Sequence, residues 1–190
     1  MIRLPRLTTD YISECVEGLR RNSEILSTMP VDIEAFAELE LGMEMIPVPQ
    51  LRGRVGADAF ITHDFSSILI DLEYFNSPKM QSRNRFSIAH ELGHFFLHKE
   101  YFIESCPSDT DEEWIQFMLQ MDDMTHHSLE WQANAFASIL LMPKQEFISS
   151  FDTHVSFAEL SRKFGVSETA VRKRIDADDV RETLSKRYLN

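Results

Sequence analysis

The chain has 190 residues, of which 43% are hydrophobic, and its formal net charge is −12. This length suits one globular domain or one domain with a small appendage, so neither disulfides nor a metal are required for folding. Only two cysteines are present, Cys15 and Cys106, which argues against a disulfide framework and fits a reducing cytosol. No run approaches the ~20 apolar residues of a membrane span, so we expect a cytoplasmic protein with no membrane contact. The negative charge argues against broad, non-specific binding of nucleic acid.

The first half of the chain predicts two helices and then three strands. Apolar residues at helical spacing predict helices over residues 9–25 and 31–41, and Asp32 and Gly42 suit the start and the end of the second. Three short runs of strand-forming residues follow, at 45–48, 59–62 and 68–72. The prolines in the first run favour an edge strand, and the other two runs flank a short turn that predicts a hairpin.

The second half of the chain predicts mainly helices. Helical periodicity covers three segments, at 86–98, 111–124 and 128–142. Between the first two segments we expect a loop over Lys99–Pro107. Because helices precede and follow the strands without alternating with them, the order predicts an α+β fold with a small three-stranded sheet. We place the main domain at residues 1–150 and a helical subdomain at residues 151–190.

One predicted helix carries the segment His90-Glu91-Leu92-Gly93-His94. Its two histidines stand at i and i+4, so they lie on one helix face, close enough to bind one zinc ion. Glu91 then lies beside the metal, where its carboxylate can accept a proton from bound water. This combination predicts a zinc hydrolase and, among hydrolases, a peptidase.

Two histidines do not complete a catalytic zinc site, which usually has three protein ligands and one open position. A metzincin would have a glycine and a histidine where this chain has Leu97 and Glu100, so that spacing fails. An acid on the later helix fits better. Glu130 could reach the metal, and Asn134, one turn further on, could hydrogen-bond a ligand. Fallback ligands stand nearby in the sequence, at Asp122, Asp123, His126 and His127.

The sequence leaves two further roles open. A donor should stabilise the oxyanion of the reaction, and the candidates are His98, Tyr101, His126 and His127. His98 continues the row of histidines by one turn, so it either supports the site or packs at the helix end. Cys106 lies in the predicted loop and could bind zinc as an inhibitory fourth ligand, or it could be a small packed thiol.

The tail over residues 157–175 predicts helix, turn and helix, with Gly165 at the turn and Ser167 as the cap of the second helix. Three basic residues, Arg172, Lys173 and Arg174, would lie on that second helix, as in a DNA-binding helix-turn-helix. The same pattern also suits a hairpin that packs on the main domain. Residues 156–190 hold eight Lys and Arg against six Asp and Glu, which is weak support for DNA binding.

Several segments together resemble the ImmA/IrrE family of zinc metallopeptidases, over roughly residues 30–175. They are Arg85–His94, Glu130–Ala137 and Leu140–Pro143. The resemblance implies a zincin-like domain in which His90, His94 and Glu130 bind zinc and Glu91 is the general base. The long acidic insert between His98 and Glu130 departs from the family pattern and leaves open what covers the active site.

The resemblance also implies a protein substrate. In this family the substrate is a helix-turn-helix transcriptional repressor, cleaved to relieve repression in stress responses, mobile elements or phage defence, and single-stranded DNA is a possible effector. No Lys or Arg occurs between Glu100 and Pro143, and such an acidic region would favour a basic substrate or simply be a solvated face. Two rival interpretations are a DNA-binding regulator with a structural zinc site and a toxin-like protease held by a partner.

Overall fold

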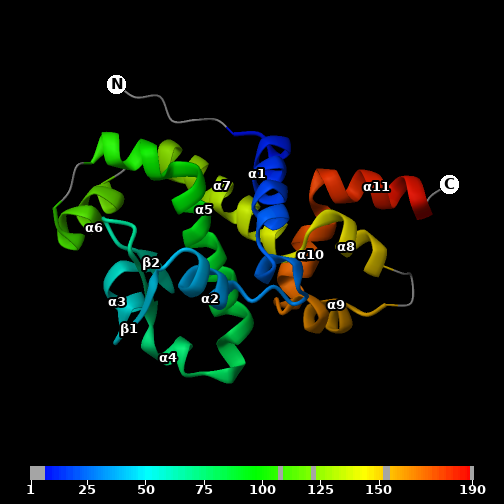
Figure 1. Cartoon of the computed structure of the whole chain (residues 1–190), viewed down its shortest axis with the longest axis horizontal. Coiled ribbons are helices and arrows are strands. Elements are labelled where there is room, and N and C mark those ends of the chain that lie inside the picture. Colours follow the sequence, from blue (N-terminus) through cyan, green and yellow to red (C-terminus); the bar gives the residue numbers. More distant parts are fainter. Residues whose placement is uncertain (1–6, 107–108, 121–122, 152–154, 189–190) are drawn as a thin grey trace.

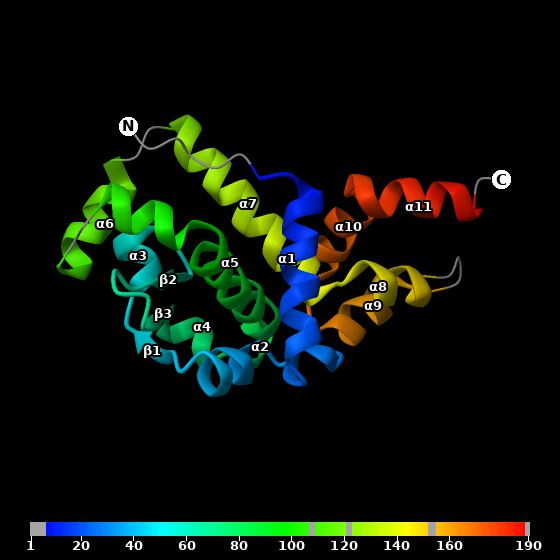
Figure 2. The ribbon, with the colours of Figure 1, turned by 45° about the horizontal axis from the view of Figure 1, so that its top comes forward.

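The computed structural model describes residues 7–106, 109–120, 123–151 and 155–188. These residues form helices and one small sheet, which confirms the predicted α+β fold. The strands and the short helices beside them lie at one end of the molecule, and the C-terminal helices lie at the other (Figure 1). Helix α1 (Thr9–Asn22) stands between these two parts and packs on α7 (Asp123–Leu141) (Figure 2).

The two predicted N-terminal helices are present, with altered ends. Helix α1 ends at Asn22, three residues earlier than predicted, and a short 3-10 turn, η1 (Ile25–Ser27), follows it. The second helix consists of α2 (Ile33–Ala35) and a wider π-helical turn, η2 (Phe36–Glu40). Asp32 caps this helix by accepting a hydrogen bond from the Ala35 amide, as its residue type predicts.

The sheet contains three strands, β1 (Glu44–Val48), β2 (Ala59–Ile61) and β3 (Ser67–Asp71). Their order is β1-β3-β2, with β1 parallel to β3 and β2 antiparallel to it. The predicted hairpin and the predicted edge position of β1 are therefore confirmed. Strand β2 forms the other edge, and it contacts the motif helix more extensively than β3 does. Three short helical segments flank the strands: α3 (Leu51–Val55), α4 (Leu72–Phe75) and η3 (Pro78–Met80).

The motif helix, α5 (Gln81–Ser105), is longer than predicted. The predicted loop over Lys99–Pro107 is wrong, because the helix continues through Ser105. Its buried row does not stop at the motif: His94, His98 and Phe102 follow one another at intervals of four residues, and all are buried. The large apolar ring of Phe102 thus extends the buried face by one turn and keeps the segment helical.

The two helices after the motif differ from prediction in their bounds. Helix α6 (Asp111–Gln120) begins where predicted and ends four residues earlier. Helix α7 begins five residues before its predicted start, while residues 121 and 122 lie outside the described residues. Helices α5 and α7 pack on each other and contribute several buried apolar residues to the core, among them Ile88, Leu92, Phe136 and Leu140.

Four helices complete the chain: α8 (Lys144–Ser150), α9 (Phe157–Phe164), α10 (Glu168–Asp176) and α11 (Asp178–Tyr188). As predicted, Gly165 makes the turn between α9 and α10 with a positive φ of 63°, and Ser167 caps α10. Helix α11 has no counterpart in the sequence analysis. The domain boundary at residue 150 stays a prediction.

The basic side chains of α10 are not arranged as predicted. Arg174 is 1% exposed, and its guanidinium donates to the Met142 carbonyl and to both carboxylate oxygens of Asp179, at 3.0, 2.8 and 2.9 Å. Arg172 lies over the ring of Phe157, with its guanidinium carbon 4.0 Å from the ring centroid. The prediction that Arg174 lies on the surface is therefore wrong, because this residue joins α10 to the neighbouring helices from within.

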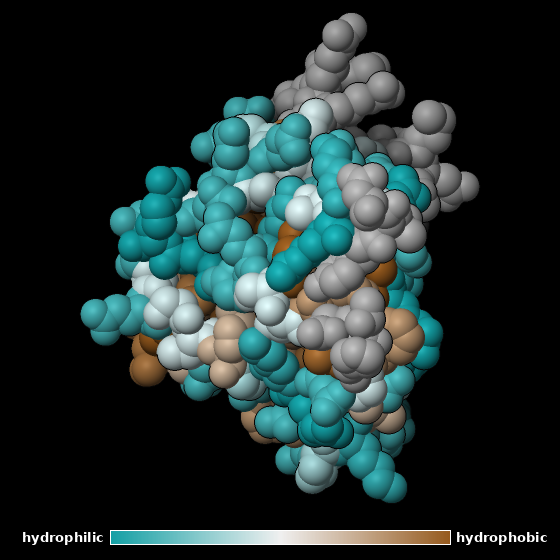
Figure 3. All heavy atoms as spheres, turned by 90° about the vertical axis from the view of Figure 1, so that its right-hand side faces the viewer, coloured by the Kyte–Doolittle hydropathy of each residue, from teal (hydrophilic) through white to brown (hydrophobic). Residues whose placement is uncertain are grey.

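The end of the molecule that carries these helices shows a mainly hydrophilic face, in which apolar residues appear as small separate groups (Figure 3). Buried residues of α9, α10 and α11 hold this end together, among them Leu160, Phe164, Val171 and Val180. Among the described helices, none is both long and apolar enough to cross a membrane.

Candidate metal centre

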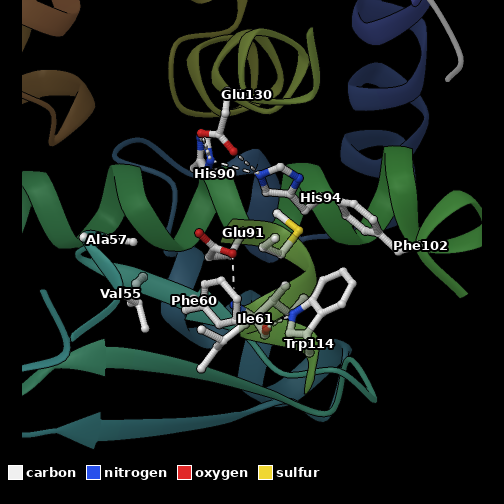
Figure 4. Close-up of a pocket in the computed structure, with 14 residues that line it drawn as sticks. Val55, Ala57, Phe60, Ile61, His90, Glu91, His94, Phe102, Trp114 and Glu130 are labelled. Carbon is white, nitrogen blue, oxygen red and sulfur yellow. Dashed lines mark hydrogen bonds and ion pairs between the residues drawn. The ribbon is translucent and has the colours of Figure 1, made fainter. Parts of the chain in front are cut away.

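The candidate site forms where α7 crosses α5 (Figure 4). Gly93, inside the motif, makes this crossing close: a Cβ atom at that position would lie 2.9 Å from the Cα and 3.1 Å from the carbonyl oxygen of Ala133. Such a distance is too short for a side chain, so only glycine allows the two backbones this approach. The crossing brings Glu130 of α7 over the two motif histidines of α5 (Figure 4).

Three side chains converge at this crossing. The Nε2 atoms of His90 and His94 lie 3.1 Å apart, and each lies 3.2 Å from one of the two carboxylate oxygens of Glu130. Among the described residues, these three form a group of donors that could hold one metal ion. The structure thus brings together the three residues that the sequence analysis proposed as ligands.

The dimensions of this group fit zinc. Ligand atoms 2.0–2.2 Å from a tetrahedral zinc ion lie about 3.3–3.6 Å from one another. The two imidazole Nε2 atoms are 3.1 Å apart and each is 3.2 Å from a different oxygen of Glu130, so one ligand atom from each residue lies within 4.8 Å of the others. Two imidazoles and one carboxylate also form a donor set typical of catalytic zinc, which leaves a fourth position open.

The charge of Glu130 matches this role, while a metal ion would have to displace the proton that Glu130 and Glu91 favour on His90. Burial opposes the ionisation of Glu130, but its hydrogen bonds and ion pairs with His90 and His94 outweigh burial and hold its pKa well below the usual range. Burial likewise opposes the protonation of His90, yet the hydrogen bond to Glu130 and the charge of Glu91 leave its pKa raised. The carboxylate is therefore anionic at neutral pH, as a metal ligand must be.

Each ligand histidine has a partner for its other ring nitrogen. His90 Nδ1 lies 3.3 Å from Asn134 Oδ1, which is the contact proposed for Asn134 from the sequence. His94 Nδ1 lies 3.1 Å from His98 Nδ1, and His98 Nε2 lies 3.2 Å from Gln132 Oε1. Burial, together with His94, lowers the pKa of His98 to about 3, so this imidazole is neutral at physiological pH.

Gln132 was not among the predicted site residues. A signal for it existed, because this polar side chain stands on the buried face of α7 beside Ala133 and between the buried apolar residues Leu129 and Phe136. A polar residue on such a face usually has a specific partner. The sequence does not indicate that the partner is His98, on another helix.

Glu91 points away from Glu130 and towards strand β2 (Figure 4). Its Oε2 accepts a hydrogen bond from the backbone N–H of Ile61 at 3.0 Å, and the residue is 7% exposed. Burial raises the pKa of Glu91 to about 7, while His90 and the Ile61 amide act in the opposite direction. A carboxyl group with this pKa can both accept and return a proton near neutral pH.

A cavity of about 230 Å³ adjoins the donor group. The donor residues and Glu91 form one side of it. Residues 55–57 and apolar residues of β2, α5 and α6 form the rest, among them Phe60, Ile61, Phe102, Trp114 and Met118. The cavity therefore places a water-accessible, mostly apolar space directly beside Glu91 and the three possible metal ligands.

Helix α6 belongs to the acidic insert between His98 and Glu130, and it covers this cavity. The indole N–H of Trp114 donates to the carbonyl of Ile61 at 3.0 Å, and the residue is buried. At the start of the helix, the Asp111 carboxylate accepts a hydrogen bond from the backbone N–H of His63 at 2.9 Å and lies 2.8 Å from the His63 ring. The insert is thus fastened to the β2–β3 hairpin at two points.

The remaining candidates lie elsewhere. Cys106 caps the end of α5, twelve residues after His94, and a helix rises about 18 Å over that length, so the thiol does not join the described donor group. The proposal of Cys106 as a fourth ligand depended on the loop that is not present. Tyr101 is not among the described residues that line the cavity. The side chains at 122, 123, 126 and 127 lie outside the described residues.

Comparisons with known proteins agree with this geometry. The chain is similar in structure to a Mycobacterium tuberculosis transcriptional regulator, with a TM-score of 0.57 and 18% sequence identity. The match covers 87% of this chain but 46% of the regulator, so this chain spans about half the length of that protein. At this identity the likeness concerns the fold. No curated protein matches the chain.

A family model adds sequence evidence to the likeness of fold. Residues 74–176, more than half of the chain, match the peptidase M78 family, described as the IrrE N-terminal-like domain. The matched region contains α5, α6 and α7, and with them Glu91 and all three residues of the donor group. The match supports a peptidase from a family of metalloenzymes, and the chain belongs to the IrrE N-terminal-like family.

Proposed function

We propose that this protein is a zinc-dependent endopeptidase in which His90, His94 and Glu130 hold the metal and Glu91 is the general base. The observation that carries the proposal is the convergence of three side chains, whose possible ligand atoms lie within 4.8 Å of one another, beside a buried carboxyl group and a cavity. Zinc held in this way would lower the pKa of a coordinated water to about 7 and would polarise the carbonyl of the scissile bond.

The protein's own groups supply the proton transfers. Glu91 accepts a proton at its carboxylate, and it returns the proton to the leaving amine after the bond is cleaved. Its hydrogen bond from Ile61 leaves the second carboxylate oxygen, Oε1, for this task. The apolar wall formed by Phe60, Phe102 and Trp114 excludes bulk water and so strengthens electrostatic interactions in the cavity.

We further propose a basic protein as the substrate, in particular a helix-turn-helix repressor whose cleavage relieves repression. Support comes from charge: α6, which covers the cavity, begins with Asp111, Glu112 and Glu113, and the last two are exposed. An acidic surface at the site favours approach of a positively charged DNA-binding domain over that of an acidic protein.

The test uses the zinc-loaded full chain and the purified helix-turn-helix repressor encoded beside its gene, with and without single-stranded DNA. We expect cleavage of the repressor, and we expect Glu91→Gln to reduce the cleavage rate by about 10²–10⁴-fold. The zinc content of that variant, measured by atomic absorption, should remain at one ion per chain. Faster cleavage with single-stranded DNA would identify it as an effector.

Glu104→Gln is the matched control, because Glu104 is an exposed carboxylate on the same helix, remote from the donor group. This variant should cleave at the parent rate. Equal cleavage by the parent and by Glu91→Gln would refute the assigned base, and a chain that takes up no zinc would refute the metal centre.

The rival function, a DNA-binding regulator with structural zinc, has weaker support. Its predicted contact helix, α10, turns Arg174 inward and holds Arg172 against Phe157. A structural zinc site also has no use for a buried carboxyl group at the position of Glu91. Normal regulation by Glu91→Gln in cells would favour this rival.

A further inference from the structure

A row of buried polar side chains leads from the donor group into the protein interior. It contains His94, His98 and Gln132, which are 3%, 0% and 1% exposed. The ring nitrogens Nδ1 of the two histidines lie 3.1 Å apart, His98 Nε2 lies 3.2 Å from Gln132 Oε1, and Gln132 Nε2 donates to Ser128 Oγ at 3.2 Å. The row crosses from α5 to α7, one turn beyond the crossing that forms the metal centre.

The protons in this row can be placed by counting donors and acceptors. A neutral imidazole has one N–H and one nitrogen lone pair. When a metal occupies the donor group, the Nε2 of His94 must offer its lone pair to that metal, so its proton belongs on Nδ1. That proton is donated to His98 Nδ1, which leaves the proton of His98 on Nε2, where it is donated to the Gln132 carbonyl oxygen. Each imidazole N–H in the row then meets an acceptor.

The end of the row explains why a glutamine is present. A carboxylate at that position would place a net negative charge among fully buried groups, which is costly without a positive partner. The glutamine amide instead accepts from His98 and donates to Ser128 without any charge. His90 is held differently, by one direct contact with Asn134, whose side chain is exposed.

We infer that His98 and Gln132 are positioning residues, which hold His94 in the tautomer whose Nε2 lone pair faces the metal. This inference rests on the proposed metal centre. It assigns a role to two buried residues that touch neither the metal position nor the cavity. It also predicts that their loss weakens metal binding without removing any ligand, because a ligand histidine with the wrong tautomer cannot bind.

The first test uses the zinc-loaded chain, labelled with ¹⁵N-histidine, because nitrogen NMR distinguishes the two tautomers. We expect a proton on Nδ1 of His94 and on Nε2 of His98 in the parent. Gln132→Leu removes the acceptor at similar volume, so His98 should become a mixture of tautomers. Gln132→Glu keeps an acceptor oxygen, so His98 Nε2 should stay protonated in that variant, although the buried carboxylate lowers its stability. If the parent carries the proton of His98 on Nδ1, the inference is wrong, whether or not the Leu variant folds.

The second test measures zinc affinity by competition with a chelator. Gln132→Leu should weaken zinc binding by about 10- to 100-fold. The matched control is Asn134→Leu, on the same helix, which should alter the tautomer of His90 and leave the signals of His98 unchanged. A purely structural role would instead lower the melting temperature of Gln132→Leu while its zinc affinity and tautomers stay at parent values, and that result would overturn the inference.

The two tests also separate this inference from the proposed function. A parent chain that binds zinc and shows the expected tautomers but cleaves no protein would contradict the peptidase proposal and leave the positioning role intact. A parent chain that binds no zinc would contradict both.

Discussion

Among single residues, Glu91 is the one whose burial most clearly affects the stability of the folded chain. Burial raises its pKa to about 7, although the Ile61 amide and His90 favour the charged form. An acid with a higher pKa in the folded state than in the unfolded state opposes folding once the pH is high enough to ionise it. The stability of the metal-free chain should therefore fall as the pH rises from about 4.5 to about 7, and this contribution should be constant above that range.

The substitution Glu91→Gln tests whether ionisation of Glu91 lowers the stability of the folded chain. The variant cannot ionise at residue 91. Between pH 4.5 and pH 8, the free energy of unfolding of the metal-free variant should therefore rise relative to that of the metal-free parent, by on the order of 3 kcal/mol. Urea unfolding at the two pH values measures the effect, and Glu104→Gln should show none of it. A stability difference between parent and variant that is independent of pH would show that Glu91 ionises as readily in the folded chain as in the unfolded one.

At the scale of elements, the crossing of α5 and α7 depends on Gly93. Helix propensity alone favours alanine over glycine inside a helix by about 1 kcal/mol. In this position, however, a Cβ atom would lie 2.9 Å from the Cα of Ala133, which belongs to the backbone and cannot move without shifting α7. Because Glu130 is carried by the same helix, a shift of α7 would also move the carboxylate away from the two histidines.

Gly93→Ala should therefore destabilise the chain by about 1–3 kcal/mol and weaken zinc binding. Gly18→Ala, in the interior of α1, is the matched control, because a Cβ there meets nothing within 4 Å. That variant should gain about 0.5–1 kcal/mol. Thermal unfolding of both, together with chelator competition, measures the outcome. Stabilisation by both substitutions would mean that the helices do not approach this closely.

Helix α6 is the element that closes the cavity. Trp114 holds it in place, with its indole bonded to Ile61 and its ring 4.8 Å from that of Phe102, centroid to centroid. Among the described residues, this helix makes few polar contacts with the β2–β3 hairpin besides this indole hydrogen bond and the contact of Asp111 with His63. A protein substrate is much larger than the 230 Å³ cavity, so under the proposed function only a short segment of the substrate occupies the cavity beside α6.

Trp114→Phe removes the indole hydrogen bond and keeps an aromatic ring. We expect a loss of about 1 kcal/mol, confined to the opening of α6. Hydrogen exchange followed by mass spectrometry should show faster exchange over residues 111–120 and unchanged exchange in α5 around the motif. Equal acceleration in both helices would mean that α6 does not open separately.

Across the whole molecule, Arg85 connects the motif helix to two distant segments. Its guanidinium donates to the carbonyl of Gly165, between α9 and α10, at 3.1 Å, and to the carbonyl of Val31, before α2. Burial lowers the pKa of Arg85, although Glu34 and Asp32 favour its charged form. A single side chain, five residues before His90, thus ties α5 to the N-terminal segment and to the C-terminal helices.

Arg85→Met should cost about 1.5–3 kcal/mol of unfolding free energy, the range for hydrogen bonds from a charged group. Arg83→Met is the matched control, since Arg83 lies 47% exposed in an ion pair with Asp58, and exposed pairs contribute at most about 1 kcal/mol. Chemical denaturation of both variants gives the comparison. Equal losses would show that the two connections of Arg85 do not stabilise the fold.

Much of the fold could be predicted from local patterns. The caps at Asp32 and Ser167, the turn at Gly165 and the hairpin of β2 and β3 were predicted correctly, because each depends on a few neighbouring residues. The ends of helices were predicted less well. The extension of α5 to Ser105 depends on burial of His98 and Phe102 against other elements, which polar neighbours such as Lys99 and Glu100 obscure in the sequence.

The pair of histidines on one helix face and the glutamate beside them could be predicted from the chain alone, because helical geometry fixes the relation of residues four apart. Residue type also indicated Glu130 and Asn134 as candidates. Four other relations could be seen only in the folded chain: Glu130 meets both histidines, Cys106 lies far from them, Arg174 is buried, and Gln132 completes a buried row behind His94. The physical reason is that these relations join different helices, and the angle and closeness of helix packing depend on the whole core and on contacts such as Gly93 with Ala133.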